Sequence, residues 1–296
     1  MPFGLLTGLG AALSWGTMDV ASALASRRIG SLLVTAGVIL VSATWLLLLT
    51  FFSGTPAMPG LGTLAVCALL GLIGAGAYFC YFAGLRFGPI SVVSGMVAAY
   101  GGLTVVLSVV LRGESLTLTQ AFGAAIATAG VILTGVAFEG GLRGTRFAGP
   151  GVAFAVVALV LFALMAIVTD VALESAGWLQ VLLISRLVTA AISIVVVGTL
   201  AARRVPATAR DGSPLQFGRE RVIAAILFAG TLDALGLASF AIGLERAPTW
   251  MVGLASSFGP AVTILVAVAF LGERLKPIQW FGLSGVAVGM IAIALP

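Results

Sequence analysis

Residues 113–130 read GESLTLTQAFGAAIATAG, and residues 272–289 read GERLKPIQWFGLSGVAVG. Both stretches begin with Gly-Glu, continue through Gln-x-Phe-Gly and end on a glycine. Extended without gaps, the comparison pairs residues 84–132 with 243–291 at a constant offset of 159, with 14 identities in 49 positions. Paired Glu, Gln and Pro residues do not arise from a shared apolar composition. We therefore interpret the chain as two copies of one unit.

Both copies consist of apolar runs of about 20 residues, the length that a helix needs to cross a bilayer. We predict ten such runs, at residues 3–26, 31–53, 61–85, 89–111, 117–138, 148–173, 178–200, 221–245, 249–271 and 276–295. The halves 1–140 and 141–296 then hold five helices each. Because an odd number of crossings separates equivalent residues, the second copy enters the membrane from the opposite side. The sequence thus predicts an all-α membrane protein with ten transmembrane helices in two inverted five-helix repeats.

The composition excludes several classes of protein. Hydrophobic residues make up 60% of the 296 residues and charged residues 8%, against roughly 25% charged residues in soluble domains. The net charge of +5 comes mainly from arginines scattered over short loops, which argues against nucleic-acid binding. The chain has no histidine, and its two cysteines, Cys67 and Cys80, share one apolar segment. We therefore expect no disulfide, metal, other cofactor or enzymatic activity.

The distribution of basic residues predicts the orientation in the membrane. One face of the predicted bundle collects Arg27, Arg28, Arg86, Arg143, Arg146, Arg203, Arg204, Arg210, Arg219, Arg221, Arg274 and Lys276. The other face has only Arg112 and Arg246. Because cytoplasmic loops carry the excess of basic residues, this count places both chain ends outside the cytoplasm.

A repeated set of residues resembles the EamA domain of the drug/metabolite transporter superfamily. The set comprises Trp15-Gly16, then Pro89, Gly113-Glu114, Gln120, Gly123 and Gly130, and again Pro248, Gly272-Glu273, Gln279, Gly282 and Gly289. The resemblance implies a ten-helix carrier with a central cavity between the repeats, often an exporter of amino acids or related compounds. It also implies cytoplasmic termini, and on this point we keep the loop count. The chain departs from the family in having Gly101 opposite Pro260, and in its mid-segment aspartates.

Three aspartates lie inside predicted helices, at Asp19, Asp170 and Asp233. An ionisable group near the bilayer centre costs at least about 2.5 to 3.5 kcal/mol, so each is a candidate for substrate binding or proton coupling. The alternative is structural, with hydrogen bonds between helices or an ion pair with Arg186, the basic residue that lies well inside a helix. Asp19 and Asp170 each open an Asp-Val-Ala tripeptide, which suggests equivalent positions in the two repeats.

Aromatic and hydroxyl side chains complete the predicted substrate site. Trp15 lies one helical turn before Asp19, and an aromatic ring beside an acid suits a substrate that carries an amine. Further candidates are three tyrosines and two serines, the serines beside a Gly-Pro break: Tyr78, Tyr81, Tyr100, Ser256 and Ser257. Ordinary packing is the alternative for each of them. We interpret Glu114 and Glu273 as residues that define turns.

The function that these features favour is secondary active transport by alternating access. We expect a multi-pass protein of a bacterial inner membrane, acting as a monomer in the lipid bilayer on a small-molecule substrate. Export of metabolites such as amino acids, aromatic ones included, is the first hypothesis. The alternatives are proton-coupled export of amphipathic cations or drugs, and a passive channel or scramblase.

Overall fold

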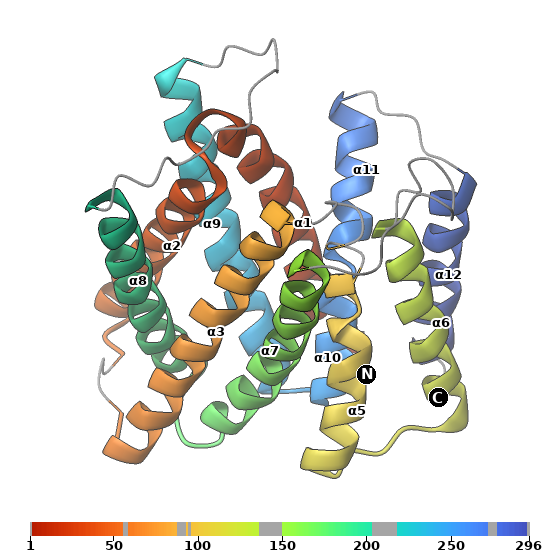
Figure 1. Cartoon of the computed structure of the whole chain (residues 1–296). Helices are drawn as coiled ribbons and strands as arrows, with labels where there is room; N and C mark the ends of the chain where they lie inside the picture. The colour runs from red at the N-terminus through yellow and green to blue at the C-terminus, as the bar shows by residue number, and fades with distance from the viewer. Residues whose placement is uncertain are drawn as a thin grey trace.

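The computed structural model describes residues 2–55, 59–87, 93, 96–135, 150–202, 218–271 and 277–294. In these ranges every regular element is an α-helix (Figure 1), which confirms the predicted all-α class. The helices are α1 (Pro2–Ile29), α2 (Ser31–Ser53), α3 (Leu61–Phe87), α5 (Tyr100–Arg112), α6 (Leu118–Gly135), α7 (Pro150–Leu173), α8 (Trp178–Ala202), α9 (Arg219–Leu244), α10 (Thr249–Ser256), α11 (Gly259–Leu271) and α12 (Pro277–Ala294).

The outside of the bundle is apolar, as lipid contact requires. Phe51 and Phe52 are each 79% exposed, and Phe281 is 76% exposed. Within the described residues, six helices are long and apolar enough to cross a membrane: α2, α3, α7, α8, α9 and α12. The apolar helices α5 and α6 are shorter. The chain is therefore a multi-pass membrane protein, although the predicted count of ten crossings is larger than the six that length and composition identify.

Helix boundaries repeat at the offset found in the sequence. Helices α5 and α11 begin and end 159 residues apart, and so do α6 and α12. The packing repeats as well: α1 lies against α9 as α3 lies against α7, and α2 lies against α9 as α3 lies against α8. The two halves of the chain are therefore two copies of one structural unit.

The contact between α6 and α12 shows how the two copies are related. A Cβ added at Gly130 would lie 2.7 Å from the carbonyl oxygen of Gly282, and one added at Gly289 would lie 2.6 Å from that of Gly123. Only glycine permits this approach of two helix backbones. Because residue 123 meets residue 289 while residue 130 meets residue 282, these equivalent helices run antiparallel. They are inverted copies of each other.

The single helices predicted at 89–111 and 249–271 are each interrupted. In the second repeat a turn at Ser257 and Phe258 separates α10 from α11. Pro260 contributes to this break because it has no N–H to donate to the preceding turn. In the first repeat residues 96–98 are helical, Ala99 is a turn residue and α5 begins at Tyr100. Ala99 and Phe258 are 159 residues apart, so the interruption belongs to the repeated unit and does not depend on proline.

Both chain ends lie toward one side of the bundle (Figure 1). On that side α5 and α7 end, and α8 and α10 begin. We call it the chain-end side. The predicted cytoplasmic face is the opposite one, and it includes several segments outside the described residues.

Candidate functional site

The most buried charges of the described chain form an ion pair within the second repeat. Asp233 on α9 is 1% exposed and Arg186 on α8 is 5% exposed. Nη2 of Arg186 donates to Oδ2 of Asp233. Nε of the same guanidinium is buried and has no hydrogen-bond partner within the described structure. Desolvating two charges is costly, and such pairs inside membrane proteins commonly mark a substrate or ion pathway.

A cavity of about 30 Å³ adjoins this ion pair. Its polar lining consists of Tyr78, Thr169, Ser185, Arg186 and Thr189, and Leu70, Gly74, Met165, Leu182 and Leu237 complete it. These residues come from α3 in the first repeat and from α7, α8 and α9 in the second. The cavity therefore lies between the repeats. It has room for about one water molecule, so a metabolite needs these helices to move apart.

Tyr78 connects the two repeats at this cavity. The Arg186 guanidinium carbon lies 5.9 Å from the centre of the Tyr78 ring, and the guanidinium also interacts electrostatically with the phenol group. An arginine at this distance from a tyrosine ring is attracted by the ring quadrupole. The predicted residues Tyr78 and Asp233 are thus both partners of Arg186, which the sequence suggested only as a structural counter-ion.

All three predicted tyrosines meet at one phenylalanine of α7. The ring of Phe162 lies 5.5 Å from Tyr78, 6.4 Å from Tyr81 and 5.9 Å from Tyr100, measured between ring centroids. These distances are typical of stabilising aromatic pairs. Phe162 was absent from the sequence-based candidates, because a phenylalanine inside an apolar run looks like any lipid-facing residue.

Asp19 on α1 belongs to the same region. Its carboxyl interacts electrostatically with Asp233 and with the hydroxyl of Thr263 on α11. The Trp15 ring, one turn earlier, lies 5.8 Å from the ring of Phe240 on α9. The indole N–H of Trp15 is buried and has no hydrogen-bond partner within the described structure. The acid and aromatic pair expected on α1 is therefore present beside the central ion pair.

The two serines lie at the helix break, and both bond to their own helix. Ser256 donates to the carbonyl of Gly253 at 2.8 Å, and Ser257 donates to that of Leu254 at 2.7 Å. The hydroxyl groups of Tyr100 and Ser256 are also 3.1 Å apart, which links α5 to α10. Ser256 is thus joined to the tyrosine cluster, whereas the described contact of the Ser257 hydroxyl is local.

Aromatic contacts show which residues of α1 and α7 are equivalent. Trp15 meets Phe240 as Phe162 meets Tyr81, and Tyr81 and Phe240 are 159 residues apart. Phe162 is therefore the counterpart of Trp15. The counterpart of Asp19, four residues further along, is Ala166. The suggested equivalence of Asp19 and Asp170 is wrong, because the shared Asp-Val-Ala tripeptide falls at different levels of the two helices.

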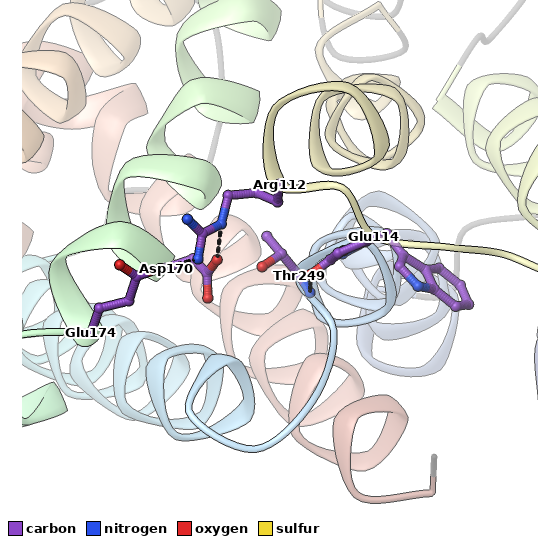
Figure 2. Close-up of polar contacts among 6 residues, drawn as sticks. Arg112, Glu114, Asp170, Glu174 and Thr249 are labelled. Carbon is purple, nitrogen blue, oxygen red and sulfur yellow. Dashed lines mark hydrogen bonds and ion pairs between the residues drawn. The ribbon is translucent and has the colours of Figure 1, made fainter.

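Asp170 lies apart from the central residues, at the chain-end side. Arg112, the last residue of α5, donates from Nε to Oδ2 of Asp170 at 2.7 Å, and its Nη2 also pairs with Glu174 (Figure 2). The Arg112 and Asp170 side chains are 26% and 16% exposed, and that of Glu174 is 57% exposed. This ion pair joins the first repeat to the end of α7.

Glu114 binds the start of α10. Its Oε1 accepts from the backbone N–H of Thr249 at 2.7 Å, and its Oε2 accepts from that of Trp250 at 3.0 Å (Figure 2). A carboxylate here satisfies free N–H groups and complements the helix dipole. The predicted turn residue therefore also connects the two repeats. Its counterpart Glu273 lies outside the described residues, as does Pro89.

These features define a class: a multi-pass helical membrane protein with a buried polar centre between two copies of one unit. No group of three His, Cys, Asp or Glu side chains among the described residues could hold a metal. The sequence profile of the EamA-like transporter family matches residues 2–136 and again residues 149–295. The chain belongs to the EamA-like transporter family, and the resemblance noted from the sequence is confirmed.

Comparison with solved structures supports the same fold. Twenty-nine chains are similar to this one. One of them, titled only "Crystal structure of protein", is 21% identical and superposes with a TM-score of 0.78 over 98% of this chain and 96% of its own. At this identity the likeness shows the fold alone. The search of curated proteins found no match.

Proposed function

We propose that the chain is a secondary active transporter that exports small zwitterionic metabolites such as amino acids, aromatic ones included. In this proposal the chain crosses a bacterial inner membrane ten times, and the two inverted repeats alternate in opening the central site. The observation that carries it is the buried pair of Arg186 and Asp233 beside the cavity between the repeats.

Opposite charges at one site suit a zwitterion. Arg186 supplies a planar group of donors for a carboxylate, and its Nε is still free to donate. Asp233 and Asp19 supply acceptors for an amine. The ring of Tyr78 lies beside the guanidinium and that of Phe162 packs against Tyr78, and the two rings provide an apolar wall for a side chain. Each charge of the substrate then finds a partner, so that neither protein charge is left unpaired.

Export of amphipathic cations is the second candidate, and Asp19 beside Trp15 favours it. A cation would exchange with a proton at Asp19 and stack on the indole. Against it stands the positive charge of Arg186, which repels a cation in a site of low dielectric constant. A channel or scramblase can be distinguished from a coupled carrier by measurement. Only the coupled carrier accumulates substrate against a concentration gradient.

Reconstitution into liposomes with an imposed proton gradient tests the proposal. We expect labelled amino acids to accumulate against their gradient, and unlabelled zwitterions to compete better than amphipathic cations. Replacing Arg186 and Asp233 together, R186Q with D233N, removes both charges without leaving one buried alone. This double variant should lose at least about tenfold in transport rate, corresponding to about 1.4 kcal/mol.

Ser193→Ala provides the matched control. Ser193 lies on α8 like Arg186, is 3% exposed, and its hydroxyl donates to the backbone of its own helix at Thr189. We expect transport by this variant to stay near wild type. Preferential competition by cations would favour the second candidate, and equal transport by the double variant and the control would refute the role of the ion pair.

A further inference from the structure

Two sets of contacts join the repeats at the chain-end side, outside the central site. In the first, Arg112 at the end of α5 pairs with Asp170 and Glu174 at the end of α7. In the second, Glu114 accepts from the backbone N–H groups of Thr249 and Trp250. Arg112 and Glu114 are separated by one residue. One short turn of the first repeat thus holds two helices of the second, as Figure 2 shows. We call these contacts the clasp.

The clasp and the central site lie at opposite ends of α5, which begins at Tyr100 and ends at Arg112. Helices α5, α7 and α10 meet at the chain-end side, and α5 carries Tyr100, whose hydroxyl lies 3.1 Å from that of Ser256 on α10. Thr249 and Trp250, which Glu114 caps, are each 1% exposed. Opening this side means moving α5 away from α7 and α10. That movement breaks the ion pair and the cap together.

The residues of the ion pair are not repeated at the equivalent sequence positions of the other copy. The residues that correspond to Arg112, Asp170 and Glu174 are Leu271, Ala23 and Arg27. None of these three can form the charge pairing seen at the chain-end side. Only the glutamate is repeated, at Glu273, which lies outside the described residues. At these equivalent positions the charged side chains are therefore present on the chain-end side and not repeated in the other copy.

We propose that the clasp is a one-sided gate that keeps the resting transporter closed at the chain-end side. The proposal rests on the alternating access proposed above. In the absence of substrate, the extra ion pair favours the conformation in which the site opens only to the opposite side. If the loop charges set the orientation, that opposite side is the cytoplasm. The resting transporter then loads its substrate from inside the cell, as an exporter does.

Cysteine accessibility tests the gate without any substrate. In a background with Cys67 and Cys80 replaced by alanine, Ser185→Cys places a thiol in the lining of the central cavity. Gly177→Cys marks the chain-end side, because Gly177 is exposed in the turn between α7 and α8 and an added Cβ there meets no atom within 4 Å. We call the thiol at residue 185 the reporter. A membrane-impermeant thiol reagent is applied to the side from which the residue 177 thiol reacts, and the labelling rate of the reporter is measured.

We expect slow labelling of the reporter in the protein with an unaltered clasp. Arg112→Gln should make labelling roughly tenfold faster, because it removes charge-assisted hydrogen bonds. Glu114→Ala should act in the same direction, and Arg112→Lys should have a smaller effect. The matched control is Arg246→Gln. Arg246 lies in the turn between α9 and α10, where its guanidinium covers the ring of Phe3 at 5.2 Å.

The expected pattern is faster labelling in the clasp variants and no change in the control. Should Arg112→Gln melt at a lower temperature than the control, Asp170→Asn with Glu174→Gln removes the same ion pair from its other half and is expected to give the same acceleration. Equal labelling rates in the clasp variants and Arg246→Gln, in proteins that melt alike, would overturn the gate. Because labelling needs no transport, failure of the transport assay leaves this result unaffected.

Discussion

The charged residues of the central site do not follow the symmetry of the scaffold that holds them. Their counterparts are uncharged: Ala166 for Asp19, Ile39 for Arg186 and Gly74 for Asp233. The aromatic residues follow it better, since Trp15 and Phe162 are equivalent, as are Tyr81 and Phe240. The repeat therefore supplies an apolar and aromatic frame around the site. The groups that can bind charge each occur in only one of the two copies.

Asp19 is the residue that we expect to couple transport to protons. Its carboxyl interacts with Asp233 and with the Thr263 hydroxyl. Because a carboxylate can bind either a proton or an amine, a proton and a substrate amine would compete for it. Asp19→Asn keeps the size and the hydrogen-bonding capacity of the side chain but cannot exchange a proton. Transport by this variant should persist with a flattened dependence on pH, measured as initial rates in liposomes over a series of pH values. An unaltered rate and pH profile would make Asp19 a packing residue.

The residues of the central site differ in how clearly the sequence marks them, for physical reasons. The cost of a buried charge identifies Asp19 and Asp233 without any structure. Arg186 was recognised only as a counter-ion, because its place beside Tyr78 depends on how α3 packs on α8. Phe162 has no chemical signal of its own. The contact of Arg112 with Asp170 joins residues 58 positions apart in different repeats, so no local pattern could reveal it.

At the scale of the elements, the contact between α6 and α12 shows that the two repeats are inverted relative to each other. Helices α6 and α12 pack through glycines that recur at the offset of 159, where an added Cβ would meet a carbonyl oxygen of the opposite helix. The repeated sequence predicted the bounds of both helices closely. It predicted the break beside Pro260 in the second copy but not the equivalent interruption at Ala99, because proline marks the break in only one copy.

Gly130→Ala tests this contact with the smallest possible change. An added Cβ would lie 2.6 Å from the backbone nitrogen of Val286, too close for the helices to stay in place. We expect a loss of about 1 to 3 kcal/mol in stability, typical of overpacking, seen as a lower melting temperature in detergent. Gly198→Ala on α8 makes the same chemical change where nothing lies within 4 Å. That control should be neutral or slightly stabilised, and equal melting of the two variants would contradict close packing at α6.

At the scale of the whole molecule, the inverted scaffold and the position of the basic loops have to agree. The antiparallel pairing of α6 and α12 requires that equivalent loops lie on opposite faces. In the topology predicted from the sequence, basic residues nevertheless gather on one face, and we expect them to give a symmetric structure a single preferred orientation. The clasp adds a second asymmetry of the same kind, since its ion pair lies on the face that has few basic residues.

The orientation of the chain can be tested with two cysteines on opposite faces. One is introduced beside Gly212, in the basic loop of residues 203–217, which lies outside the described residues. The other is Gly177→Cys at the chain-end side. Because basic loops are retained in the cytoplasm, a membrane-impermeant thiol reagent should label the residue 177 variant in intact cells and the residue 212 variant only after the cells are opened. The reverse pattern would place both chain ends in the cytoplasm, and the clasp would then close the cytoplasmic side, as in a transporter that loads its substrate from outside.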